Sequence, residues 1–210
     1  GWKDPPGRGI LRKRIYGQEG MENRMEQKGT QSLETARLLL RPFRLEDAES
    51  CLRNWASDPE VYRWISEKAK TPQEVFQWLS TAEEAYKHPE TYYWAIVEKE
   101  SGEVLGEILV DSFSSRNGWC ELDWKIGRPF WGKGYATEAA SAVLRYSRDR
   151  VGFHRIQAKC CVGNRASERV MQKLGMSKEG VLREYFQVQD GYWLDVVLYA
   201  LLCPCLLYTS

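Results

Sequence analysis

Residues 124–139 have the sequence Trp-Lys-Ile-Gly-Arg-Pro-Phe-Trp-Gly-Lys-Gly-Tyr-Ala-Thr-Glu-Ala, which is typical of a strand end, a tight glycine loop and a helix start. Apolar residues at helical spacing support the helix: Ala139, Val143, Leu144 and Tyr146. Gly132 and Gly134 can take backbone angles closed to other residues, so amide N–H groups can converge on one point. The first helical turn adds unpaired N–H groups and a partial positive charge. The stretch therefore predicts an anion site suited to phosphate.

The loop matches neither common nucleotide fingerprint, because it lacks three spaced glycines and a Gly-Lys-Ser/Thr. It resembles instead the acetyl-CoA pyrophosphate loop of the GNAT acetyltransferase superfamily. Trp131 stands where Gln or Arg is usual, as in the branch of ribosomal-protein N-terminal acetyltransferases. A plain strand-to-helix turn would look similar if the loop stood alone. The resemblance implies that Ile126 and Gly127 pair with pantetheine, and that the loop holds pyrophosphate through Trp131, Gly132, Lys133, Gly134, Tyr135, Ala136 and Thr137.

A second motif follows at residues 164–176, Asn-Arg-Ala-Ser-Glu-Arg-Val-Met-Gln-Lys-Leu-Gly-Met. It resembles the Asn-x-x-Ser…Lys-Leu-Gly-Phe segment of the same superfamily, with Met176 where Phe is usual. The resemblance implies that Asn164 binds the pantetheine arm and that Ser167 protonates the departing thiolate. Each residue alone also suits a bland role, Asn164 as a helix N-cap and Ser167 as a first-turn polar residue. Two motifs in this order identify the chain as similar to GNAT enzymes.

The general base is less well defined by the sequence. Glu121 is the first choice, because its Cys-Glu-Leu segment resembles the one in which several GNATs hold a catalytic Glu. Glu121, Asp123 and Lys125 share one face of the expected strand. If the strand is covered on both sides, paired carboxylates on this face would raise the pKa of one of them toward neutrality. If the face is open, the charged side chains are simply solvated. Glu184 is the rival, although Phe186 occupies the position matched to the proposed base of the ribosomal-protein branch. A base that acts through a relaying water molecule is the third alternative.

The bulk composition excludes several classes of protein. A formal charge of +1 over 210 residues predicts no nucleic-acid partner. No apolar run reaches membrane-spanning length, so we expect no membrane partner. The six cysteines lack paired zinc spacing and suit reduced thiols of a cytoplasmic protein. Two histidines and scattered acids predict no metal site.

The two ends of the chain differ from the middle. Residues 1–30 lack an apolar period, and we expect a disordered or non-native tail with Met21 or Met25 as the start. The last six residues, Cys-Leu-Leu-Tyr-Thr-Ser, match the translation of a transposon end used in sequencing libraries. A genuine apolar tail is the alternative. We therefore assign residues 31–203 to one domain and residues 204–210 to an adapter-derived tail.

The element order predicts an α/β fold with a mixed sheet covered by helices on both faces. A capping box at Thr71-Pro-Gln-Glu74 opens the second helix. The expected helices are 45–57, 71–87, 136–150 and 166–174. The expected strands are 35–43, 92–98, 104–113, 119–126, 153–162, 181–189 and 193–202. The resulting order, βααβββαβαββ, is also that of the GNAT fold, and the resemblance covers residues 33–202.

The resemblance carried by the two motifs implies an acetyl-CoA-dependent N-acetyltransferase, most like the ribosomal-protein-alanine type. Its acceptor is expected to be a protein N-terminal amine, attacking directly in a ternary complex because no cysteine has a nucleophile's context. A small amine (polyamine, amino acid or aminoglycoside) is an alternative acceptor. A strongly acidic groove would favour a polyamine or aminoglycoside, and a narrow, partly apolar slot would favour a peptide N-terminus. A non-catalytic CoA-binding module is the alternative of another class. Whether the chain forms a homodimer stays open.

Overall fold

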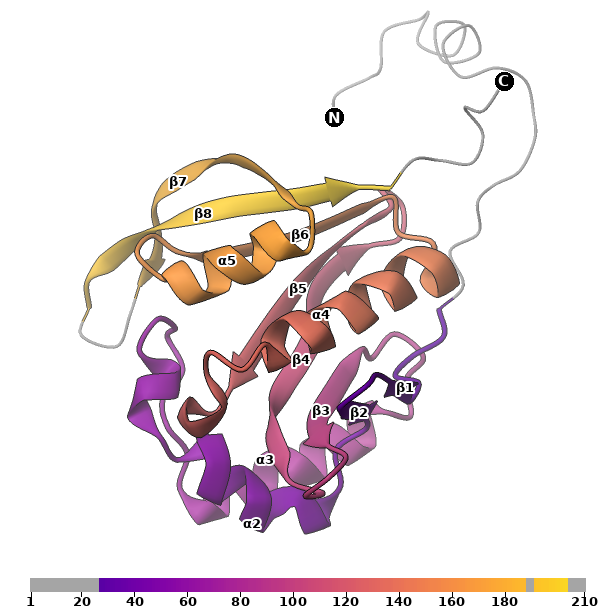
Figure 1. Ribbon diagram of the computed structural model, residues 1–210, viewed down its shortest axis with the longest axis vertical. Coiled ribbons are helices and arrows are strands. Elements are labelled where there is room, and N and C mark those ends of the chain that lie inside the picture. The colour runs from indigo at the N-terminus through magenta and orange to yellow at the C-terminus, as the bar shows by residue number, and fades with distance from the viewer. Residues whose placement is uncertain (1–26, 188–190, 204–210) are drawn as a thin grey trace, which may run out of the picture.

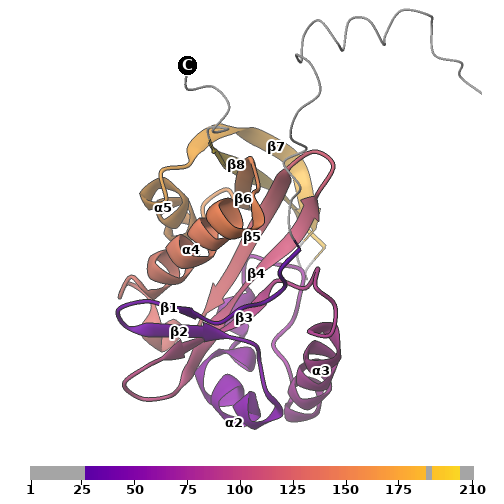
Figure 2. The same ribbon diagram turned by 90° about the vertical axis from the view of Figure 1, so that its right-hand side faces the viewer.

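The computed structural model describes residues 27–187 and 191–203, which form a single mixed sheet with helices on both faces (Figures 1 and 2). The strand order is β1-β2-β3-β4-β5-β6-β8-β7. Neighbouring strands are antiparallel except β5 and β6, which are parallel. The strands are β1 (Leu33–Glu34), β2 (Leu38–Arg41), β3 (Tyr93–Glu98), β4 (Val104–Ser114), β5 (Trp119–Ile126), β6 (Arg155–Cys161), β7 (Ser177–Gln187) and β8 (Trp193–Leu202).

Helices cover both faces of the sheet (Figure 2). Helices α2 (Ala48–Cys51) and α3 (Pro72–Ala85) lie on one face, and α4 (Tyr135–Tyr146) and α5 (Arg165–Lys173) on the other. Short 3₁₀ turns occupy Leu45–Asp47, Pro59–Tyr62 and Arg128–Phe130, and π-helical turns occupy Leu52–Ala56 and Ser147–Val151. None of the helices in the described ranges is long and apolar enough to cross a membrane.

The sheet separates two hydrophobic cores. Under α4 and α5, apolar residues of the central strands pack against Ala139, Val143 and Met171. Under α2 and α3, Trp55 packs edge to face against Trp78, with ring centres 5.6 Å apart. Because both faces are covered, each central strand is buried on both sides.

The predicted α/β fold and several local predictions are confirmed. The strand expected at 119–126 is β5 as observed, and Ala139, Val143, Leu144 and Tyr146 are all buried. The capping box of α3 is present, with the Glu74 carboxylate accepting the Thr71 N–H at 2.7 Å. These features depend on local sequence, which explains why they were predictable.

Other elements differ from expectation. The helix predicted for 45–57 is divided into a 3₁₀ turn, α2 and a π turn; the Ser57 hydroxyl donates to the Leu52 carbonyl at 2.7 Å, in competition with regular helix bonds. The strand expected at 35–43 spans only 38–41, and the 3₁₀ turn at 59–62 was not predicted. β7 begins at Ser177 rather than near 181.

The predicted domain boundaries fall only partly on described residues. Residues 27–30 were assigned to the tail, yet they pack on the domain, since Tyr146 donates to the Gly29 carbonyl at 2.7 Å and Thr30 to that of Thr91 at 2.8 Å. The rest of that tail, the adapter-derived tail and part of the predicted Asp-Gly turn at 189–192 lie outside the described residues.

The strands β5 and β6 diverge to form a wedge in the centre of the sheet. Their parallel pairing covers only three positions, ending at Glu121 opposite Gln157. β5 continues to Ile126 and β6 to Cys161 without further pairing to each other. The gap between them, here called the wedge, opens toward both layers of helices and positions the site.

Candidate active site

A cavity of about 420 Å³ lies at the wedge and is bounded by elements from both sides of the sheet. Its walls are the end of β5, the glycine loop, the end of β6, the start of α5 and the segment 60–65. The lining residues used below are Glu60, Val61, Trp64, Ile65, Asp123, Lys125, Ile126, Trp131, Gly132, Gly134, Tyr135, Ala136, Thr137, Lys159, Cys160, Asn164 and Ser167. The side that carries α4 and α5 is called the donor face, and the side that carries α2 and α3 the acceptor face.

The donor face is formed mainly by backbone. Gly132 and Gly134 have φ angles of 75° and 84°, in the left-handed region that glycine tolerates best, and α4 begins at Tyr135. The Lys133 carbonyl accepts a hydrogen bond from Arg37 at 3.0 Å. In a trans peptide the N–H points opposite to the C=O, so the Gly134 N–H is directed away from Arg37. This loop has the properties of a phosphate cradle.

Arg37 was not predicted as a site residue. Its guanidinium is held by Glu138 of α4 at 2.7 Å and stacks over the Tyr135 ring at 4.3 Å. It therefore connects the segment before β2 with both the loop and the helix. The sequence carries no signal for this, because Arg37 and Lys133 meet only in the folded chain.

Trp131 attaches the loop to the end of β5. Its indole N–H donates to the Ile126 carbonyl at 2.6 Å. The Gly127 N–H donates to the Leu105 carbonyl of β4 at 2.8 Å, and Gly127 does not line the cavity. The side chain of Lys133 lies over the Phe130 ring at 5.5 Å and also does not line it. The loop thus contributes backbone more than charge.

The start of α5 brings the second motif to the cavity. Asn164 caps the helix, its Oδ1 accepting the Ser167 N–H at 3.2 Å. Asn164 and Ser167 both line the wall beside the end of β6. The Cys160 thiol is nearby, and burial raises its pKa to about 12. A thiol with that pKa remains protonated at neutral pH and is a poor nucleophile.

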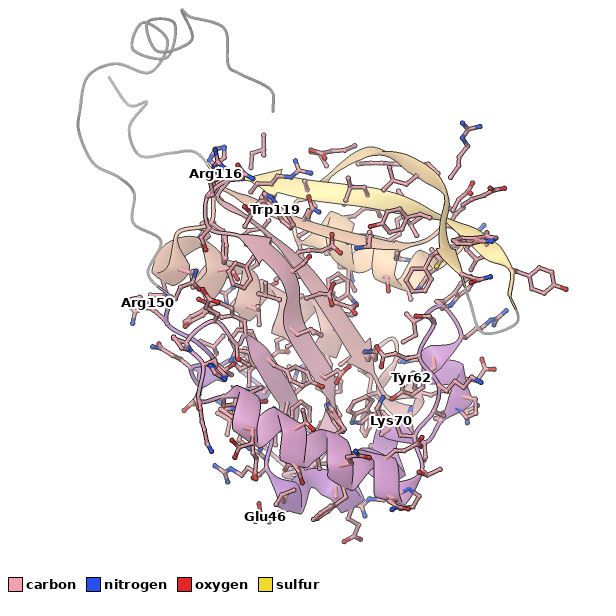
Figure 3. The ribbon with its side chains drawn as sticks, turned by 180° about the vertical axis from the view of Figure 1, so that it is seen from behind. Glu46, Tyr62, Lys70, Arg116, Trp119 and Arg150 are labelled. Carbon is pink, nitrogen blue, oxygen red and sulfur yellow. The ribbon has the colours of Figure 1, made fainter. Side chains whose placement is uncertain are left out.

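The acceptor face is walled by the segment that follows α2. Lys70 N–H donates to the Ala56 carbonyl at 2.7 Å, and Figure 3 shows the side chains of Tyr62 and Lys70 beside each other, with Lys70 Nζ 5.0 Å from the ring centre. The Cys161 thiol donates to the Trp64 carbonyl at 3.1 Å, which joins this segment to β6. Val61, Trp64 and Ile65 are half-buried and form an apolar wall.

Two of the predicted base candidates lie away from the cavity wall. Glu121 is 6% exposed, forms an ion pair with Lys159 and accepts a hydrogen bond from Gln157 at 2.8 Å. Glu184 lies on β7 with an exposed side chain and a φ of 48°, and its N–H donates to Asp195 at 2.8 Å. Neither lines the cavity. The structure therefore brings Asn164, Ser167 and the loop together, but not these two carboxylates.

Asp123 is the carboxylate that lines the cavity. It is half-buried on the acceptor face, and burial raises its pKa to about 6, against the opposing effect of Lys125. Lys125 is 8% exposed and pairs with Glu107 at 2.5 Å. The charged face of β5 is thus covered rather than solvated. Of the two alternatives for this face, the structure shows the one in which a carboxyl pKa is raised. The sequence placed Asp123 on this face without singling it out as the base.

Among the described residues no group of three or more His, Cys, Asp or Glu could hold a metal ion. Five cysteines within residues 27–187 and 191–203 are free thiols: Cys51, Cys120, Cys160, Cys161 and Cys203.

A mixed sheet that splays beside a glycine loop and a helix start is the arrangement expected of an acetyltransferase, and the comparisons with known proteins agree. Residues 37–177 match the model of the Acetyltransferase (GNAT) domain, and the chain belongs to this family. It is an acetyltransferase of the GNAT type.

Among its relatives, the chain is 32% identical over 179 residues to the uncharacterized N-acetyltransferase p20 of Bacillus licheniformis, covering 82% of this chain and 96% of that protein. It is 33% identical to the [ribosomal protein uS5]-alanine N-acetyltransferase of Escherichia coli, over 60% of this chain and 65% of that one. A crystal structure of a GNAT-family acetyltransferase from Bacillus anthracis is similar with a TM-score of 0.72 and 28% identity, covering 82% and 98% of the two chains.

Proposed function

We propose that the chain transfers the acetyl group of acetyl-CoA to the α-amine of a protein or peptide N-terminus, by direct attack in a ternary complex. The two-sided cavity supports this, since donor and acceptor can approach the wedge from opposite faces of the sheet. On the donor face, the backbone from Gly132 to Thr137 and the carbonyl end of β5 at Ile126 fit pyrophosphate and pantetheine. Asn164 would bind the pantetheine arm, and Ser167 would protonate the thiolate.

The observation that carries the choice of acceptor is the wall of the acceptor face. Val61, Trp64 and Ile65 are apolar, while only Glu60 and Asp123 supply carboxylates from the described lining. A peptide N-terminus presents one positive charge followed by a chain with apolar parts, and this wall suits it. A polyamine or aminoglycoside carries several charges and would need more carboxylates than these two.

The thiols support direct transfer and the expected compartment. Burial raises the pKa of Cys160 and Cys161, so neither is set up as an acyl-carrying nucleophile. The free thiols Cys51, Cys120 and Cys203 suit a reducing compartment such as the cytoplasm.

The test measures thiol release from acetyl-CoA with two pooled panels at equal concentration. One holds short peptides with different free N-terminal residues; the other holds polyamines, amino acids and aminoglycosides. We expect turnover with the peptides, and mass spectrometry should place the acetyl group on the α-nitrogen. Turnover restricted to the second panel would replace the proposed acceptor by a small amine. Acetyl-CoA binding by calorimetry without any turnover would favour a CoA-binding module.

A further inference from the structure

The carboxylate of Asp123 is held at the open edge of β5. The Gly127 N–H donates to β4, and in an antiparallel pair the backbone groups of successive residues point to opposite sides of the strand. The backbone groups of Trp124 and Ile126 therefore point away from β4 and toward the wedge. The Asp123 Oδ1 accepts the Trp124 N–H at 2.8 Å, so the carboxylate folds back to that edge. Its Oδ2 has no hydrogen-bond partner among residues 27–187 and 191–203.

The charges around Asp123 come from three elements. Lys125 lies two residues away on the same face of β5, and Glu107 and Asp111 come from β4. Lys125 is itself occupied by Glu107 at 2.5 Å and by Glu67, from the segment before α3, at 3.2 Å. Lys125, the cation that acts on Asp123, is therefore shared with two other carboxylates. This arrangement leaves burial as the dominant influence on Asp123, and its pKa rises to about 6.

We infer that Asp123 is the general base of this enzyme. The inference rests on the proposed function. The Asp123 carboxylate takes one proton from the acceptor ammonium, and the neutral amine attacks the thioester carbonyl carbon. The C–N bond forms, the C–S bond breaks, and the sulfur leaves as thiolate. The second proton of the former ammonium passes to the thiolate through Ser167, which gives amide and free CoA thiol.

Glu121 is less suited to this role. Both of its oxygens are engaged, Oε2 with Gln157 and Oε1 with Lys159, and it lies at the last paired position of β5 and β6. A carboxylate in that setting orients Lys159, which lines the cavity. Asp123 lies two residues further along β5 and is the first acidic residue on this face after the pairing with β6 ends.

The experiment compares Asp123→Asn with Glu121→Gln, Asp149→Asn and wild type. Asp149 is a matched control, since it forms a surface ion pair with Arg148 at 2.6 Å on the turn after α4. For each protein, kcat and KM are measured from about pH 5 to pH 9 with the most active acceptor of the two panels, and the Kd of acetyl-CoA by calorimetry. Wild type should lose activity as the pH falls through about 6, where Asp123 becomes protonated.

Asp123→Asn should lower kcat at neutral pH by about 10²-fold or more and change the Kd of acetyl-CoA by less than about twofold. Its remaining activity should climb with pH without the step near 6, because the acceptor then deprotonates in solution. Asp149→Asn should match wild type. The inference is overturned if Asp123→Asn keeps the wild-type rate and pH step, or if only Glu121→Gln loses the step. If the peptides are inactive and a small amine is active, only the proposed acceptor is overturned. The Asp123 comparison is then made with that amine. No turnover with any acceptor would overturn both.

Discussion

The donor and acceptor faces of the wedge are built differently. On the donor face, the shape comes from two glycines in the left-handed region and the first turn of α4, so the working groups are backbone amides. On the acceptor face, the groups proposed to act are charged side chains: the half-buried Asp123 and the buried pair of Lys125 and Glu107. Backbone sites depend on local conformation, whereas buried charges depend on every neighbour that contacts them. Variants on the two faces should therefore fail in different ways.

The largest effect is expected on the acceptor face from Lys125→Met. It leaves Glu107, 6% exposed, without its cation, and should cost about 3–5 kcal/mol of unfolding free energy in urea titrations. It should also shift the acid limb of activity above pH 6, because Lys125 lowers the pKa of Asp123. Lys99→Met is the control, since its pair with Glu34 at 3.0 Å is exposed and worth less than about 1 kcal/mol. Equal losses in the two variants would show that the buried pair does not hold this face.

Asp123→Asn should stabilise the protein while it inactivates it. The folded-state pKa of Asp123, about 6, lies above the ordinary value of 3.8, so the folded chain binds this proton more tightly than the unfolded chain does. That contribution to stability is present below about pH 3.8 and is lost as the pH rises through 6. The variant should gain about 1–3 kcal/mol over wild type at about pH 8 and nothing at about pH 4.

The control for that measurement is Asp149→Asn, where Arg148 lowers the pKa of the carboxyl. The sign is then opposite, and this variant should lose a little stability at high pH. A loss for Asp123→Asn at high pH would contradict the raised pKa.

On the donor face, Gly134→Val should weaken acetyl-CoA binding about tenfold or more. A φ of 84° costs an L-residue about 1–2 kcal/mol, and relief of that strain would misdirect the loop amides. Calorimetry gives the Kd. Gly102→Val is the matched control, because Gly102 also has a positive φ, of 74°. It lies in the turn between β3 and β4 with open space around it. Gly102→Val should lose comparable stability without a change in Kd, and a similar loss of affinity in both would show that general destabilisation is the cause.

The smallest effect is expected for Arg37→Met. Loss of the hydrogen bond to the Lys133 carbonyl frees the loop, but the glycines keep their conformation, so the Kd of acetyl-CoA should rise about three- to fivefold, or about 1 kcal/mol. Arg53→Met, which removes an ion pair with Glu103 at 2.8 Å away from the cavity, should leave the Kd unchanged. An unchanged Kd in Arg37→Met would show that the loop needs no such support.

Much of the fold followed from local patterns in the sequence. Thr71 and Glu74 marked the start of α3, and the alternation in residues 119–126 marked β5 with a charged face. The division of the predicted 45–57 helix was not predictable, because it depends on contacts such as the Ser57 hydroxyl with the Leu52 carbonyl. Arg37 was missed for a related reason, since its partners lie 96 and 101 residues further along the chain.

The sequence by itself determined the family, the glycine loop and the caps of the helices. Glycine conformations, N-caps and strand alternation are properties of a few consecutive residues, so they can be recognised without the fold. Only the tertiary structure decided which acid of β5 faces the cavity. Glu121 and Asp123 lie on the same face, but β6 pairs with β5 as far as Glu121 and then departs. Glu121 is consequently enclosed by Gln157 and Lys159, and Asp123 faces the open wedge.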